Sequence, residues 1–129
     1  MGRFATGVTV ITATVAGDTR VNGRLTLGEN TADNGGLRLA LMAYLNRSGA
    51  KRAEKIDGFS PEQRVFLGWA QMWCQNAAPE AERLNAQTNP HAPNRFRVNG
   101  PTSNMPEFAK AFSCRTDAPM VRPNPCRVW

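Results

Sequence analysis

Two carboxylate side chains, Glu29 and Asp33, stand four residues apart in the stretch LGENTADNGG and precede an apolar run. At about 3.6 residues per helical turn, positions 29, 33, 37, 41 and 44 fall near one stripe of a helix. The spacing therefore places both acids on the face that Leu37 and Leu41 would bury. Burial and mutual repulsion both oppose ionisation of such a pair, so the pattern requires a compensating positive charge.

Three arrangements could supply that charge, and spacing alone leaves all three open. The acids could lie at the N-terminus of the helix, where the helix dipole favours anions. They could pair with arginine side chains elsewhere in the chain. They could serve a metal ion, one acid as a ligand and the other as a support for a ligand. From spacing alone, the helix N-terminus is favoured over the metal.

Histidine and cysteine, the other common zinc ligands, are few in the sequence. There is one histidine, His91. The three cysteines have spacings that fit no zinc-binding pattern; they are Cys74, Cys114 and Cys126. His91 and Arg97 fall in a stretch rich in Pro, Asn and Gly, residues 88–104, which is typical of a loop. From this composition alone, His91 would be a solvated loop side chain and Arg97 a surface cation.

The two acids need a helix to position them, and we expect it over residues 29–46, ending before Ser48-Gly49. Adjacent glycines inside it, Gly35 and Gly36, indicate close approach by another backbone or a bulky ring. A second helix should begin at Pro61, because Ser60 is a good N-cap and Gln63 completes a capping box. Its wide apolar face predicts burial on most sides.

The remaining elements are short. Residues 7–16 are rich in Val, Ile and Thr and favour a strand, and Asn22-Gly23 should form a tight turn within extended structure. Further expected elements are helices over 79–87 and 106–112 and a short extended piece, RFRV, over 95–98. The sequence therefore predicts a single domain that is mainly α with a short N-terminal β segment.

Composition bears on the class of partner. The formal net charge is +6 and the pI is about 10.0, which could suit nucleic acid. The arginines are scattered, however, and aromatic residues do not interleave with them as a stacking platform requires. No run of about 18 apolar residues occurs, so we expect no membrane span in this chain. Nucleic-acid binding is the weakest of the functions considered.

Several segments resemble one family of enzymes. VNGRLTLGENTADNGGLRLA, residues 21–40, resembles the third-ligand segment of the neprilysin and endothelin-converting-enzyme family of zinc metallopeptidases, whose pattern there is NG..TLGENIADNGG. The likeness continues through residues 56–74 and 89–114 to the terminal CRVW, residues 126–129. It implies the C-terminal portion of a thermolysin-like zinc metallopeptidase catalytic domain. Residues 1–18 match poorly, and we expect them to form an N-terminal extension.

The resemblance implies a role for each candidate site residue. Glu29 looks like the third zinc ligand, and Asp33 like the residue that hydrogen-bonds a zinc-bound histidine. His91 resembles the histidine that stabilises the oxyanion of the tetrahedral intermediate. Arg97 resembles the arginine that grips a backbone carbonyl of the substrate. The implied cofactor is one zinc ion in the complete enzyme, the substrates are peptides, and the location is extracellular, periplasmic or the ectodomain of a membrane-anchored protein.

The sequence departs from the family pattern in one important respect. The family's catalytic helix carries HExxH, which supplies two histidine ligands and the general base, whereas this chain has one histidine. We therefore expect a partial domain over 1–129 that is inactive alone, holds zinc weakly, and needs an upstream HExxH segment and an N-terminal lobe as partners. Apolar surface left uncovered at Trp69, Trp73 and Trp129 would allow self-association. The alternative is a non-catalytic remnant or binding module that keeps the fold without HExxH.

Overall fold

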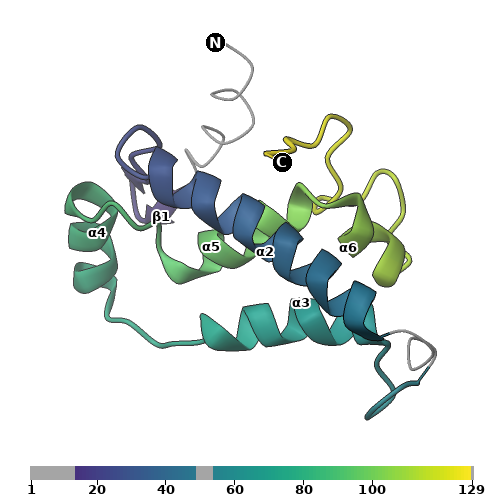
Figure 1. The fold of residues 1–129 in the computed structure, drawn as a ribbon. Coiled ribbons are helices and arrows are strands. Elements are labelled where there is room, and N and C mark those ends of the chain that lie inside the picture. Colours follow the sequence, from purple (N-terminus) through teal and green to yellow (C-terminus); the bar gives the residue numbers. More distant parts are fainter. Residues whose placement is uncertain (1–13, 49–53, 129) are drawn as a thin grey trace.

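The computed structural model describes residues 14–48 and 54–128. These residues form two short strands and five helices, confirming the predicted mainly α fold with an N-terminal β segment. In chain order they are β1 (Thr14–Ala16), β2 (Thr19–Arg20), α2 (Leu27–Ser48), α3 (Pro61–Met72), α4 (Pro79–Thr88), α5 (Asn94–Ser103) and α6 (Pro106–Ala111). The long helix α2 lies across the shorter helices α3, α5 and α6 (Figure 1).

The strands β1 and β2 pair antiparallel, and the chain reverses between them at Gly17. Gly17 has a φ of 58°, a backbone conformation that glycine adopts without steric cost. The predicted strand over 7–16 is confirmed at residues 14–16, and residues 7–13 lie outside the described ranges. Asn22 does open a turn, because its backbone oxygen accepts from the Thr26 N–H at 3.1 Å. That turn leads directly into α2, so the predicted extended structure is confirmed before the turn, at β2, and is wrong after it.

Helix α2 extends two residues beyond the predicted 29–46 at each end. Asn30 supports its first turn, since its side-chain Nδ2 donates to Thr26 Oγ1 at 2.9 Å. We expected another backbone or a bulky ring to approach the two glycines closely. This prediction is wrong at Gly36, where an added Cβ would meet no described atom of a neighbouring element within 4 Å. Gly36 instead lies on the exposed side of the helix.

The main core forms where α2 meets α3 and the start of α6. Leu37, Leu41, Phe66 and Met105 pack there with at most 3% of their surface exposed. This confirms the inward face of α2 from Asp33 to Leu41. The prediction is wrong at both ends of the stripe, because the Glu29 side chain is 42% exposed and Tyr44 is 37% exposed. A second, smaller cluster joins the strands to α4 and α5; it contains Val15, Val21, Ala86 and Ala92, with Phe96 packed against it.

Helix α3 has the start that the sequence predicts. Ser60 Oγ accepts from the Gln63 N–H at 3.2 Å, and Gln63 Oε1 accepts from the Ser60 N–H at 2.8 Å. The prediction that α3 is buried on most sides is wrong, however, because Leu67 is 39% exposed and Met72 is 61% exposed. Near the middle of α3, Phe66 is 2% exposed and belongs to the main core.

The predictions for the C-terminal half are mixed. The short helices expected over 79–87 and 106–112 are confirmed as α4 and α6. The prediction that RFRV is extended is wrong, because residues 95–98 are helical and belong to α5. Burying Phe96 against the small cluster outweighs the weak strand preference of Phe and Val. Trp129, expected to lose cover, lies outside the described residues.

Candidate zinc-ligand and substrate-contact site

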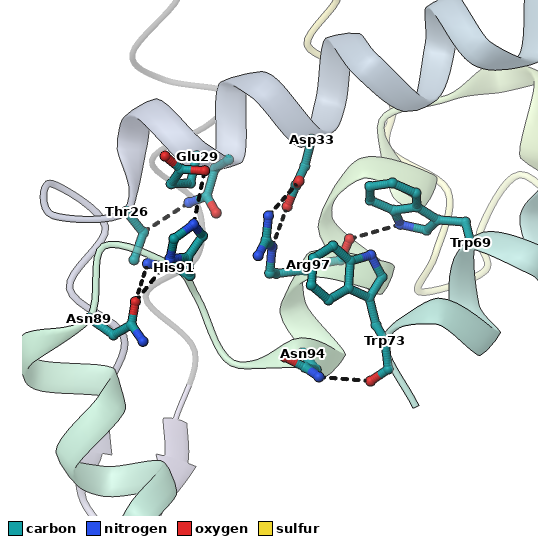
Figure 2. Close-up of polar contacts among 10 residues, drawn as sticks. Thr26, Glu29, Asp33, Trp69, Trp73, Asn89, His91, Asn94 and Arg97 are labelled. Atoms are coloured by element: carbon teal, nitrogen blue, oxygen red, sulfur yellow. Dashed lines mark hydrogen bonds and ion pairs between the residues drawn. The ribbon is translucent and has the colours of Figure 1, made fainter. Parts of the chain in front are cut away.

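The four predicted site residues come together along one side of α2. Glu29, in the first turn, projects toward the segment that joins α4 to α5, and Asp33, one turn further on, projects toward α5 (Figure 2). His91 lies in that segment and Arg97 in α5. Each acid therefore meets one basic side chain: Glu29 meets His91, and Asp33 meets Arg97.

The Glu29–His91 pair is open to solvent. Glu29 Oε2 lies 3.2 Å from His91 Nε2, and the two side chains are 42% and 46% exposed. Glu29 belongs to the first turn of α2, where the helix dipole also favours a carboxylate. A half-exposed carboxylate in this position keeps an oxygen that a cation can reach.

Asn89 holds the other edge of the His91 ring. Its Oδ1 accepts the His91 backbone N–H at 2.9 Å and lies 3.0 Å from ring Nδ1. Asn89 itself ends α4, because its N–H donates to the Asn85 oxygen at 2.9 Å. The sequence analysis missed Asn89, although Asn-Pro-His is a recognisable signal for a turn closed by an asparagine side chain.

The Asp33–Arg97 pair is closed. Arg97 Nε donates to Asp33 Oδ2 at 2.7 Å, and Arg97 Nη2 donates to Asp33 Oδ1 at 2.8 Å. The side chains are only 8% and 11% exposed, for Asp33 and Arg97 respectively. Two parallel hydrogen bonds between ions make this the stronger class of pair and fix the plane of the guanidinium. Arg97 is therefore not the surface cation that composition suggests.

Two tryptophans from α3 and its C-cap complete the setting of Arg97. The Trp73 ring lies under the guanidinium, with 3.8 Å between Arg97 Cζ and the ring centroid. Trp69 Nε1 donates to the Arg97 backbone oxygen at 3.0 Å. Asn94 Nδ2 donates to the Trp73 backbone oxygen at 2.9 Å, which ties the end of α3 to the start of α5. Figure 2 shows these contacts around Arg97.

Of the three arrangements that could compensate the charges of the two acids, the structure contains two. Asp33 is answered by an arginine, and Glu29 by the helix N-terminus together with His91. Glu29 and His91 are donor types that zinc accepts, but a zinc site takes three or more protein ligands. Within residues 14–48 and 54–128, no three His, Cys, Asp or Glu side chains gather as a metal-binding group. Glu29 and His91 are therefore two possible donors without a third beside them among the described residues.

The comparisons with known proteins agree on one family. The sequence model of Peptidase family M13 matches residues 7–128. This chain belongs to peptidase family M13. Human endothelin-converting enzyme 1 is 47% identical over 112 residues, and neprilysin-1 of Caenorhabditis elegans is 44% identical over 117 residues. These matches cover 84% and 87% of the chain but only 14% and 16% of the two relatives.

A solved structure agrees with the fold of this M13 chain. The crystal structure of the Mycobacterium tuberculosis zinc metalloprotease Zmp1 in complex with an inhibitor superposes with a TM-score of 0.85 at 34% identity. The match covers 97% of the chain and 21% of that enzyme. The family resemblance and the fold expected from it, part of a zinc metallopeptidase catalytic domain, are confirmed. None of the helices within the described ranges is long and apolar enough to cross a membrane.

Proposed function

We propose that this chain is part of a zinc-dependent metalloendopeptidase and supplies Glu29 as the third zinc ligand. The observation that carries the proposal is the contrast between the two acids of α2. Asp33 is sealed against Arg97, whereas Glu29 is 42% exposed and bonded only at its Oε2 edge among the described residues. Membership of family M13 and similarity to a zinc metalloprotease support zinc as the cation.

Zinc bound at Glu29 would supply Lewis-acid activation of the scissile carbonyl or of a water. His91 would donate a hydrogen bond from Nε2 to the substrate carbonyl oxygen as negative charge develops there. Its distance of 3.2 Å from Glu29 keeps that nitrogen beside the proposed ligand. The proposed role of His91 is therefore catalytic and not metal binding.

Arg97 would bind a backbone carbonyl of the peptide. Nε and one N–H of Nη2 are committed to Asp33, which leaves the two N–H groups of Nη1 and the second N–H of Nη2 for substrate. Asp33 is proposed to support a zinc-bound histidine as well. Each of its oxygens accepts one bond from Arg97, and each keeps a second lone pair for an imidazole N–H.

The remaining zinc ligands and the general base would come from an HExxH segment, because the sequence holds only one histidine. We expect the 129-residue chain alone to be inactive and to hold no zinc tightly. An ectoenzyme or secreted location follows from the same proposal.

The test is a chimera of human endothelin-converting enzyme 1 in which this chain replaces the matching 112-residue segment. We expect one zinc ion per molecule by metal analysis and hydrolysis of a fluorogenic peptide. Glu29→Ala should abolish zinc retention, whereas Glu54→Ala, at an exposed glutamate away from the site, should leave it unchanged. Zinc content that survives Glu29→Ala would reject the ligand role. A chimera that folds and holds zinc without hydrolysing peptide would favour the binding-module alternative.

A further inference from the structure

The structure assigns to Trp69 a positioning role for Arg97, the residue proposed above to bind a backbone carbonyl of the peptide. The indole N–H of Trp69 takes the place of a backbone donor that helix α5 lacks at this point. The importance of Arg97 for peptide binding rests on the proposed function, whereas the contact itself is formed by this chain's own residues.

Helix α5 carries a proline where the Arg97 carbonyl would find its regular donor. In an α-helix each backbone carbonyl accepts from the N–H four residues later, so the donor for Arg97 would come from residue 101. That residue is Pro101, which is buried inside α5 and has no N–H. The Arg97 carbonyl therefore lacks the donor that a regular helix would supply.

Trp69 supplies a donor from α3. Its Nε1 donates to the Arg97 backbone oxygen at 3.0 Å. The indole is itself held in place, because it packs against the main core and meets the Trp73 ring edge to face, with 5.6 Å between the ring centroids. Figure 2 shows both tryptophans beside Arg97. Since the indole has a single N–H and its orientation is set by packing, this bond fixes the Arg97 backbone relative to α3.

The three partners of Arg97 act on different parts of the residue. Asp33 sets the plane of the guanidinium, and Trp73 covers one of its faces. Trp69 fixes the backbone from which the side chain extends. Loss of that bond would shift the remaining N–H groups of Arg97, which the proposed function assigns to the substrate. We therefore expect Trp69 to affect peptide binding and not the chemical step.

The first test follows the Arg97 side chain in the 129-residue chain. The Arg97 Nε–H is bonded to Asp33 in a sealed pair, so NMR should record slow hydrogen exchange for it. Trp69→Phe keeps an aromatic ring but removes the N–H, and should speed this exchange by about 2- to 10-fold, the range expected for loss of one hydrogen bond. The backbone amides of Leu37 and Leu41, in the main core, should change less.

Restoring the missing backbone donor gives the decisive comparison. Pro101→Ala places an N–H at residue 101, where the Arg97 carbonyl can accept it within α5. In that background Trp69→Phe should no longer speed exchange of the Arg97 Nε–H. If Trp69 acted by packing alone, the effect would persist, because alanine at 101 does not replace the lost indole volume. Val65→Ala, which removes an apolar contact between α3 and the main core, is the control and should have no preferential effect at Arg97.

The second test measures peptide hydrolysis by the chimera with human endothelin-converting enzyme 1. Trp69→Phe should raise KM for the peptide by about 2- to 10-fold and leave kcat and zinc content unchanged. Adding Pro101→Ala should return KM to the value of the chimera. Arg97→Ala should raise KM at least as much, and adding Trp69→Phe to it should change nothing further, because Trp69 acts through Arg97.

The backbone amide spectrum of each variant checks its fold. If Trp69→Phe unfolds the chain, a benzothiophene in place of the Trp69 indole keeps the shape without the N–H and carries the same expectation. Unchanged exchange at Arg97 in a folded variant, or a change that Pro101→Ala does not reverse, would overturn the assignment. A KM that responds to Arg97→Ala but not to Trp69→Phe would overturn it as well. A KM indifferent to Arg97→Ala would instead reject the substrate role of Arg97 and leave the exchange result standing.

Discussion

The two acid–base pairs on α2 are one helical turn apart and differ sharply in environment. Asp33 and Arg97 share two hydrogen bonds, are at most 11% exposed, and have Trp73 against the guanidinium. Glu29 and His91 share one contact of 3.2 Å and are more than 40% exposed. The closed pair joins α2 to α5, whereas the open pair is accessible to solvent.

The difference arises from what lies opposite each turn of the helix. Asp33 faces α5 at the place where the tryptophans of α3 and its C-cap also pack. Glu29 lies nearer the start of α2 and faces the loop that carries His91. A carboxylate that is sealed and doubly paired is poorly placed to bind a cation, so the comparison favours Glu29 as the metal ligand.

The largest effect should come from opening the closed pair. Asp33→Ala leaves the Arg97 charge buried without its partner, which typically costs about 3–5 kcal/mol in free energy of unfolding. Urea denaturation of the 129-residue chain measures this loss. Asp117→Ala, which removes one partner of an exposed pair with Arg115, is the control and should cost at most about 1 kcal/mol. Equal losses for the two variants would contradict the description of the Asp33 pair as sealed.

A smaller effect should come from the ring against the guanidinium. A double-mutant cycle with Trp73→Leu and Arg97→Met should give a coupling free energy of about 2 kcal/mol, because the contact is largely desolvated. The matched cycle uses Arg95 and Phe96. Arg95 is exposed, and its Cζ lies 4.7 Å from the centroid of the Phe96 ring. It should give about 0.5–1 kcal/mol. A zero coupling at Trp73 would show that the ring only fills space.

The smallest effect on stability should come from the open pair. Glu29→Ala should change the free energy of unfolding of the 129-residue chain by no more than about 1 kcal/mol, because both partners are exposed. Added salt should reduce even that difference by screening. Urea denaturation at low and high salt checks both statements. A loss as large as that of Asp33→Ala would mean that Glu29 is structural, and would remove the contrast between the two pairs.

The parts of the fold that sequence predicted well are those with local causes. The capping box of Ser60 and Gln63 acts within α3 alone, and it is confirmed. The spacing of Leu37 and Leu41 acts within α2 alone, and their burial is confirmed. The prediction of an extended RFRV segment is wrong because the conformation of this segment depends on packing Phe96 against residues from the strands and α4. The exposed side of α3 was missed for a similar reason, since an apolar stripe does not reveal how much of it a neighbour covers.

The sequence by itself determined that two acids would lie one turn apart on one helix and that a family motif surrounds them. It did not determine their burial, because Asp33 is 8% exposed and Glu29 is 42% exposed. It also placed His91 and Arg97 among the candidate residues through the family resemblance. Only the tertiary structure decided which base meets which acid. Asp33 and Arg97 are 64 residues apart, and their pairing depends on how α5 packs between α2 and the tryptophans of α3 and its C-cap. Spacing along the chain carries no information about such a contact, because burial and partner choice are set by the packing of whole helices.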